Sequence, residues 1–282
     1  MGAGLMLAKA DLQRTANRER VALGTLEKDY VITEMLKALP QMSDIKEMFI
    51  FKGGTALRKV YFPDWRYSED LDFTVKHDMA KEELKEVLES WYKQVEQESQ
   101  IQLSTRMLHK PGGYARVRTQ FLGPLAYPSM IYMDLSFDEP LCLEPQFRRI
   151  FAYPFGGEER EVLAYPLEEL LAEKLRSLLE RGKSRDYYDV WRLLKEHSSE
   201  LNLELLGMVM AKKLAHKGLY LHTIGDFLPE DLKELKRYWE EDLGQQISSL
   251  PPIEPVLEDL GQMLDKFVAP YILSSQIKGH GK

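Results

Sequence analysis

The spacing of hydrophobic residues changes at Pro166 and divides this 282-residue chain into two parts. Before Pro166, apolar residues at helical spacing predict a helix that Pro40 ends and a long amphipathic helix over 81–97. The polar run Glu27–Tyr30 on the first of these helices is typical of a solvated face. Short apolar runs between turns predict strands over residues 48–51, 71–75, 101–106, 114–121 and 130–137.

After Pro166 the pattern is helical. Leucines at helical spacing predict a helix that ends at Gly182, and Ser184 is a typical N-cap for the next one. We expect further helices over 201–217, 229–243 and 253–268, and a hairpin turn at Gly156-Gly157. This order of elements predicts an α+β fold. We therefore expect one domain over 1–165, a helical lobe over 166–273 and a disordered tail over 274–282.

Composition and charge exclude several classes of protein. Cys142 is the only cysteine, which excludes an internal disulfide and a cysteine zinc site and favours the cytoplasm. Apolar runs fall far short of the roughly 20 residues that cross a bilayer. The net charge of -7 disfavours a nucleic-acid partner, but Asp226–Asp265 holds 11 acidic and 3 basic side chains. The rest of the chain is nearly neutral and has room for a basic patch, while the acidic segment suits a basic partner or simple solvation.

Residues 51–73 read as strand, glycine turn, helix, loop and strand. Asp70 and Asp72 lie two apart on the second strand, so their carboxylates share a face and repel each other unless a cation lies between them. Magnesium suits such oxygen ligands, and the alternative is the exposed face of an edge strand. Gly53 and Gly54 open a helix, where free N–H groups and the helix dipole favour a phosphate. A plain turn is the alternative for the two glycines.

Asp134 lies in an otherwise apolar predicted strand. A carboxylate is costly to bury unpaired, so we expect it at an exposed edge or beside a cation. Because Asp70 and Asp72 already indicate a cation, we favour Asp134 as the third ligand. The sequence has no Walker-type phosphate loop, no hydrolase nucleophile elbow and no histidine pair at metal-binding spacing.

Together these motifs resemble those of a known enzyme family. The runs FKGGTALRKVY, RYSEDLDF and AYPLEELLAEKLRSLLERGKSRDYYDVW, with the leading helix LEKDYVITEMLKAL, resemble the AbiEii/AbiGii (MenT-like) nucleotidyltransferase toxins. These belong to the polymerase-beta-like nucleotidyltransferase superfamily, so the resemblance implies a mixed sheet with flanking helices and a helical C-terminal lobe. It covers roughly residues 25–195, and residues 200–282 carry no matching motif.

The resemblance also implies a set of site residues. Two magnesium ions are expected on three carboxylates, those of Asp70, Asp72 and Asp134. The triphosphate is expected at Gly53, Gly54 and Thr55. Lys52 and Arg58 flank the turn and are candidate phosphate contacts, with surface solvation as the alternative, and Ser68 is positioned to line the pocket. Lys174 is expected to face the nucleotide and Asp186 to act in the family's R-D-x-Y-D motif. From the residues alone, Lys174 is equally a lysine whose stem lies along apolar surface, Asp186 is a helix N-terminal acid, and Asp189 is structural.

The expected reaction moves a nucleoside monophosphate from a nucleoside triphosphate to an acceptor. The resemblance suggests RNA, notably the 3′ end of tRNA, as the acceptor and a cognate antitoxin as a partner. Basic residues of the second part, among them Arg181, Lys183 and Arg185, are candidate RNA contacts, although solvated helix faces explain them equally well. Two alternatives stay open: transfer to a protein hydroxyl, and a non-catalytic nucleotide- or partner-binding module.

Overall fold

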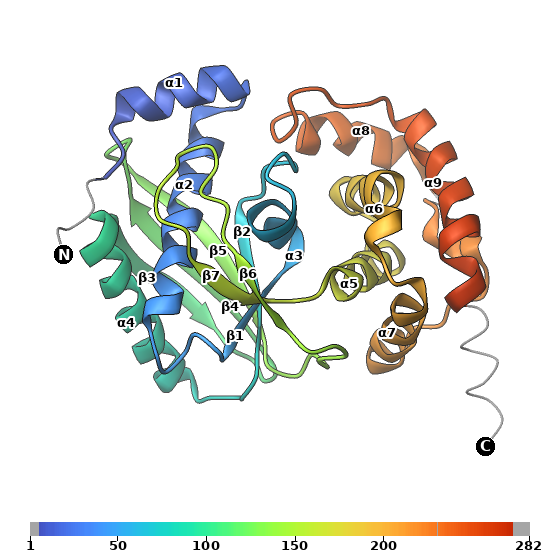
Figure 1. The fold of residues 1–282 in the computed structure, drawn as a ribbon, viewed down its shortest axis with the longest axis horizontal. Coiled ribbons are helices and arrows are strands. Elements are labelled where there is room, and N and C mark those ends of the chain that lie inside the picture. Colours follow the sequence, from blue (N-terminus) through green and yellow to red (C-terminus); the bar gives the residue numbers. More distant parts are fainter. Residues whose placement is uncertain (1–5, 230, 273–282) are drawn as a thin grey trace. The chain divides into compact units, whose positions relative to one another are not determined.

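Within residues 6–229 and 231–272, which this computed structural model describes, seven strands form a mixed sheet in the order β3-β4-β5-β2-β1-β7-β6 (Figure 1). The neighbours β2–β5 and β1–β7 are parallel, and the other neighbours are antiparallel. The strands are β1 (Phe49–Lys52), β2 (Asp70–Val75), β3 (Gln102–His109), β4 (Tyr114–Leu122), β5 (Pro128–Ser136), β6 (Gln146–Arg149) and β7 (Glu161–Ala164).

Two long helices of the first part cover one face of this sheet. The Trp91 ring on α4 packs 6.0 Å from Phe49 and 5.8 Å from Phe73, and its Nε1 donates a hydrogen bond to the Met35 carbonyl on α2. The helical elements here are α1 (Lys9–Glu19), α2 (Leu23–Ala38), a 3₁₀ turn (Leu39–Gln41), α3 (Gly53–Ala56), a π-helical turn (Leu57–Tyr61) and α4 (Lys81–Ser99).

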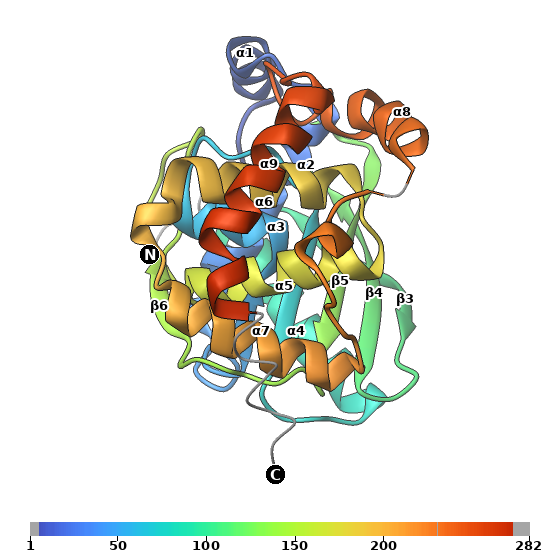
Figure 2. The same cartoon turned by 90° about the vertical axis from the view of Figure 1, so that its right-hand side faces the viewer.

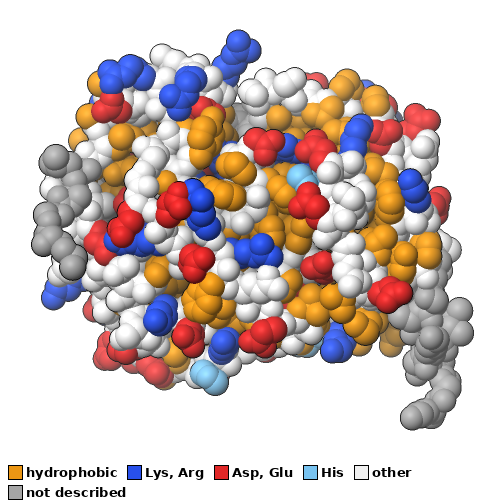
Figure 3. All heavy atoms as spheres, viewed as in Figure 1, with side chains coloured by type: hydrophobic (Ala, Val, Ile, Leu, Met, Phe, Trp, Pro, Cys, Tyr) orange, Lys and Arg blue, Asp and Glu red, His pale blue; other side chains and the backbone are white. Residues whose placement is uncertain are grey.

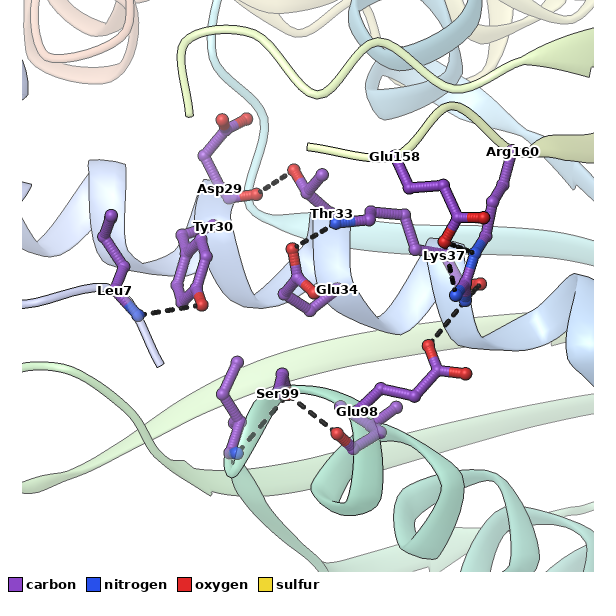
Figure 4. A network of polar contacts seen from close by, with 12 residues as sticks. Leu7, Asp29, Tyr30, Thr33, Glu34, Lys37, Glu98, Ser99, Glu158 and Arg160 are labelled. Carbon is purple, nitrogen blue, oxygen red and sulfur yellow. Dashed lines mark hydrogen bonds and ion pairs between the residues drawn. The ribbon is translucent and has the colours of Figure 1, made fainter. Parts of the chain in front are cut away.

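Arg160, just before β7, connects these two helices (Figure 4). Its guanidinium donates to the Lys37 carbonyl on α2 at 2.6 Å and to Glu98 on α4 at 2.5 Å. Glu158 accepts from the same guanidinium at 3.0 Å. Hydrogen bonds to charged groups are the stronger kind, so this network fixes α2 and α4 to the strand that follows.

The second part of the chain is a separate helical unit. Its elements are α5 (Leu167–Glu180), α6 (Ser184–His197), a 3₁₀ turn (Ser198–Glu200), α7 (Leu203–Lys217), a 3₁₀ turn (Ile224–Phe227), α8 (Leu232–Leu243) and α9 (Ile253–Phe267). Here α9 packs against α6 and crosses it (Figure 2). The segment Pro140–Glu144 also belongs to this unit, because the Glu169 carboxylate accepts from the backbone N–H groups of Cys142 and Leu143, both at 3.0 Å.

The α+β fold class expected from the sequence is confirmed. The first unit ends at Ala164 and the second begins at Tyr165, with only Pro140–Glu144 out of order. The tail expected over 274–282 lies outside the described residues. None of the helices in the described ranges combines the length and apolar character that crossing a membrane requires.

Local predictions differ from the structure at several boundaries. The strand expected over 101–106 begins at Gln102 and continues to His109. Ser184 is not the N-cap of α6: Lys183 holds that position and makes no side-chain cap, while the buried Ser184 hydroxyl has no hydrogen-bond partner among the described residues. The glycine pair 156–157 does lie in the connection between the antiparallel strands β6 and β7.

Candidate functional site

The three predicted metal ligands lie on one face of two neighbouring parallel strands. Asp72 on β2 is the register partner of Asp134 on β5, and Asp70 is the partner of Tyr132. Residues two apart on a strand share a face, so Asp70 and Asp72 lie on the same side as Asp134. β2 lies between β5 and β1, and β5 between β4 and β2, so neither strand is an edge. The edge-strand alternative is therefore wrong for all three carboxylates.

The glycine turn lies directly against one of these carboxylates. Gly53 has φ +80°, a conformation that costs a residue with a side chain roughly 1–2 kcal/mol. A Cβ placed on Gly53 would lie 2.1 Å from Asp72 Oδ2. A Cβ on Gly54 would lie 2.7 Å from Arg66 Nη2 and 3.5 Å from Ser68 Oγ. Position 53 therefore requires glycine, because of its backbone conformation and the Asp72 side chain, whereas a side chain at position 54 would displace the Arg66 guanidinium.

The remaining predicted nucleotide-binding residues of the first unit gather at this turn. Lys52 on β1 is buried and is the register partner of Asp72 on β2. The Thr55 hydroxyl donates to the Asp70 carbonyl at 2.5 Å, which ties the helix to the start of β2. Ser68 is buried in the loop that leads into β2. The structure thus brings these predicted residues together. The Thr55 hydroxyl already donates its hydrogen bond to the backbone.

Side chains of helix α2 contact two segments of the site, the helical turns after the glycines and the residue just before β2. Asp29 forms buried ion pairs with Lys59 at 2.7 Å and Arg58 at 3.3 Å, on the helical turns that follow the glycines. Burial lowers the pKa of Lys59 to about 8, although Asp29 opposes that shift. Glu69, next to Asp70, accepts from Thr25 at 2.9 Å and from a lysine of α2 at 2.5 Å.

These contacts correct two expectations. The run Glu27–Tyr30 is not a solvated face, because Glu27, Asp29 and Tyr30 are buried. Glu27 accepts the backbone N–H of Leu125 at 2.7 Å. Arg58 is no phosphate contact, since its buried guanidinium pairs with Asp29 and donates to two loop carbonyls.

Two residues that the sequence did not identify hold the third carboxylate. The Tyr114 hydroxyl on β4 donates to Asp134 Oδ1 at 2.6 Å, and Arg116 Nε lies 3.4 Å from the same oxygen. Burial, this hydrogen bond and the charges of Asp134 and Asp72 raise the pKa of Tyr114, so the phenol stays a donor at neutral pH. The signal was present in the sequence: alternation along β4 places Tyr114 and Arg116 on the polar face of the strand.

The donor set fits a divalent cation. Asp70, Asp72 and Asp134 offer only carboxylate oxygens, which Mg²⁺ prefers, and strand register places them side by side. As their side chains stand, however, no three His, Cys, Asp or Glu residues in the described ranges are close enough to share an ion. A cation bound by all three carboxylates would therefore require side-chain positions other than those seen here.

The predicted residues of the second unit form a buried cluster of their own. Lys174 Nζ on α5 lies 2.7 Å from Asp189 and 3.4 Å from Asp186, both on α6. Arg181 donates to the two Asp186 oxygens at 2.9 and 3.1 Å. Burial opposes ionisation of Asp186, but Lys174 and Arg181 outweigh it and lower its pKa. Asp186 is thus held as a carboxylate, and both buried aspartates lie within ion-pair distance of the buried Lys174.

The candidate RNA contacts of this unit have mixed surroundings. Arg181 and Lys183 are exposed, although Arg181 also pairs with Asp186, and Arg185 is half-buried. Arg181 and Lys183 line a cavity of about 650 Å³. The charged residues that share this lining are mostly acidic: Glu180, Asp231, Glu234 and Asp242.

Comparison with solved structures finds a protein of the same fold. The structure matches that of MenT4, the nucleotidyltransferase toxin Rv2826c from Mycobacterium tuberculosis H37Rv, with a TM-score of 0.72 and 17% sequence identity. The match covers 91% of this chain and 88% of MenT4, and no curated protein matches the sequence. The two proteins therefore share a fold.

The family follows from the sequence itself. The profile described as nucleotidyl transferase AbiEii toxin, type IV toxin–antitoxin system, matches residues 36–266, most of the chain. The chain therefore belongs to the AbiEii family of nucleotidyltransferase toxins, which confirms the resemblance seen in the motifs. The matched range extends well beyond residue 200, where no motif was recognised.

Proposed function

We propose that this toxin transfers a nucleoside monophosphate from a nucleoside triphosphate to the 3′ end of tRNA. The acceptor hydroxyl oxygen forms a bond to the α-phosphorus, and the bond from that phosphorus to the oxygen bridging to the β-phosphate breaks. Pyrophosphate leaves, and the hydroxyl proton passes to a base. Phosphoryl chemistry of this kind depends mainly on positioning and charge stabilisation, which fixed carboxylates, N–H groups and cations supply.

Each predicted residue has a role in this proposal. Asp70, Asp72 and Asp134 would hold two magnesium ions, which lower the pKa of the acceptor hydroxyl and neutralise charge on the triphosphate. Asp134 is the base. Gly53 and Gly54 admit the triphosphate to the backbone N–H groups at the start of α3, where an anion is favoured. The side chains of Lys52 and Ser68 line the same turn.

From the second unit, Lys174 is proposed to contact the nucleotide and Asp186 to hold that lysine in position. The support is their pairing: a buried ammonium between two buried carboxylates is costly to maintain and is typical of functional sites. Arg181, Lys183 and Arg185 are proposed RNA contacts from this unit. We further propose that the enzyme acts in the cytoplasm and is restrained by a cognate antitoxin.

The observation that carries the proposal is the register of Asp72 with Asp134 beside the turn at Gly53. This register brings two carboxylates and the backbone N–H groups at the start of α3 into one small region, which supports the proposed metal and phosphate binding. The test is incubation of the purified protein with each of the four labelled nucleoside triphosphates, with total tRNA or with protein extract, and with magnesium or a chelator. We expect label in tRNA with magnesium and none with the chelator.

The two competing functions give different outcomes in the same assay. Label confined to protein bands would replace tRNA by a protein hydroxyl as acceptor. No label in any fraction, from a protein that still binds triphosphate, would indicate a non-catalytic nucleotide-binding module. Either result contradicts the proposal.

A further inference from the structure

The polar face of β3 and β4 carries basic side chains without acidic ones. The two strands, QLSTRMLH and YARVRTQFL, contain three arginines, one histidine and no Asp or Glu, in a chain of net charge -7. Alternation along β4 buries Ala115 and Val117 and exposes Arg116 and Arg118 on the opposite side. That opposite side is the one on which Asp134 lies, because Arg116 is the register partner of Asp134.

A β-bulge adds a third arginine to this face. The register of β3 with β4 shifts between Thr105 and Met107, so Arg106 is an extra residue and lies with Met107 opposite Arg118. The Arg106 guanidinium donates to the side chain of Gln120, two residues along β4 from Arg118. Bulges re-aim side chains, and this one keeps Arg106 beside Arg118.

Apolar and aromatic groups lie among the arginines. Met107 is 45% exposed and Tyr114 is 37% exposed, high values for such side chains. The Arg116 guanidinium carbon lies 5.3 Å from the centre of the Tyr132 ring. The Arg118 guanidinium forms no hydrogen bond or ion pair with another residue that the structure describes. We call the exposed group Arg106, Met107, Tyr114, Arg116 and Arg118 the arginine face.

The arginine face begins at the carboxylate site. Arg116 Nε lies 3.4 Å from Asp134 Oδ1, and neighbouring strands are about 4.8 Å apart. Arg118 lies two residues further along β4, a step of about 7 Å. A chain with regularly spaced negative charges could therefore run along β4 and end at Asp134.

We propose that the arginine face binds the single-stranded end of the RNA acceptor and leads its terminal hydroxyl to the carboxylates. Single strands are bound by stacking of bases on aromatic side chains and arginine planes, with basic groups on the phosphates, and this face offers both. In the cavity of the second unit acidic side chains outnumber basic ones, so the RNA contacts proposed there for Arg181 and Lys183 are secondary to those of the arginine face. On the face of the molecule drawn in Figure 3, acidic and basic side chains are mixed, so that face shows no purely basic patch. The inference rests on the proposed RNA acceptor.

The test measures RNA binding apart from catalysis. A fluorescent oligoribonucleotide with the sequence of a tRNA 3′ end is titrated with full-length protein in a chelator, without triphosphate, at several salt concentrations. The variant Arg106→Ala/Arg118→Ala should bind at least tenfold more weakly. Its slope of log affinity against log salt should be shallower by about 1.4, since each phosphate contact on a single strand contributes about 0.7. Arg106→Lys/Arg118→Lys should restore the slope, because charge is retained.

The matched control is Arg14→Ala/Arg18→Ala on α1, which removes two exposed arginines of the same unit and should leave RNA affinity unchanged. Circular dichroism verifies that each variant is folded. Equal RNA affinity of the Arg106/Arg118 variant and the wild type overturns the inference, as does equally tight binding of polyglutamate to the wild type. If the wild type labels tRNA while the variant binds RNA normally, the arginine face is wrong and the proposed function stands. If the wild type neither binds nor labels RNA, the proposed acceptor fails and the arginine face with it.

Discussion

Gly53 is the position where fold and chemistry meet most closely, and Gly53→Ala tests both. A Cβ at this position would lie 2.1 Å from Asp72 Oδ2, although such contacts essentially never fall below 3.0 Å. The Asp72 carboxylate must therefore move by roughly 1 Å. A misplacement of about 1 Å at a reacting centre can cost about 100-fold in rate.

The stability effect has two parts. Alanine at φ +80° costs roughly 1–3 kcal/mol, offset by about 0.4–1 kcal/mol because alanine restricts the unfolded chain. The contact with Asp72 adds to this cost. At about 2–4 °C per kcal/mol, we expect Tm to fall by several degrees, measured by calorimetry alongside the single-turnover transfer rate.

A double-mutant cycle separates the two parts. In an Asp72→Ala background the nearest carboxylate atoms are gone, so Gly53→Ala should cost less, by about 0.5–3 kcal/mol. Gly24→Ala on α2 is the matched control, because nothing lies within 4 Å of its Cβ. It should keep full activity and gain up to about 1 kcal/mol in stability. A Gly53→Ala protein with wild-type Tm and activity would refute the reasoning.

Three further predictions concern charged groups. Asp29→Asn leaves Lys59 buried without its carboxylate and should lower the free energy of unfolding by about 3–5 kcal/mol in urea titrations; a change below 1 kcal/mol would contradict the buried pairing. Tyr114→Phe removes the donor to Asp134 and should slow single-turnover transfer roughly 10- to 100-fold with little change in Tm, whereas an unchanged rate would exclude a positioning role. The lowered pKa of Asp186 contributes stability that is complete above its ordinary pKa of 3.8 and is lost as pH falls through the lower folded value. Asp186→Asn should therefore flatten the dependence of the urea midpoint on pH below about 4, and an unaltered acid slope would argue against the ion pair.

The parts of the site that are local in sequence could be predicted from the sequence. Asp70, Asp72 and the two glycines lie within one strand–turn–helix–strand unit, so their spacing alone placed them together. Asp134 was favoured as the third ligand only because Asp70 and Asp72 already indicated a cation, since its register with Asp72 depends on a pairing between strands some 60 residues apart. Periodicity alone left its edge or interior position open.

The parts of the site that depend on long-range pairing could not be predicted from the sequence. Asp29 reads as a solvated residue because its partners, Lys59 and Arg58, lie about 30 residues away and are themselves buried. The bulge at Arg106 is likewise invisible in a pattern of alternation, since it exists only in the pairing of β3 with β4. Hydrophobic periodicity records which residues are apolar, and it contains no information on which buried charges meet.

The most direct test of the carboxylate site compares Asp72→Asn with Asp78→Asn. Asp78 is exposed and lies just beyond the end of β2. Its carboxylate forms an ion pair with Lys110. Transfer of labelled nucleotide to tRNA is followed in single turnovers across a magnesium titration, with circular dichroism for each protein. We predict a fall on the order of 10²–10³-fold for Asp72→Asn and a rate near wild type for Asp78→Asn. A folded Asp72→Asn protein that transfers nucleotide at the wild-type rate would contradict the assignment of the site.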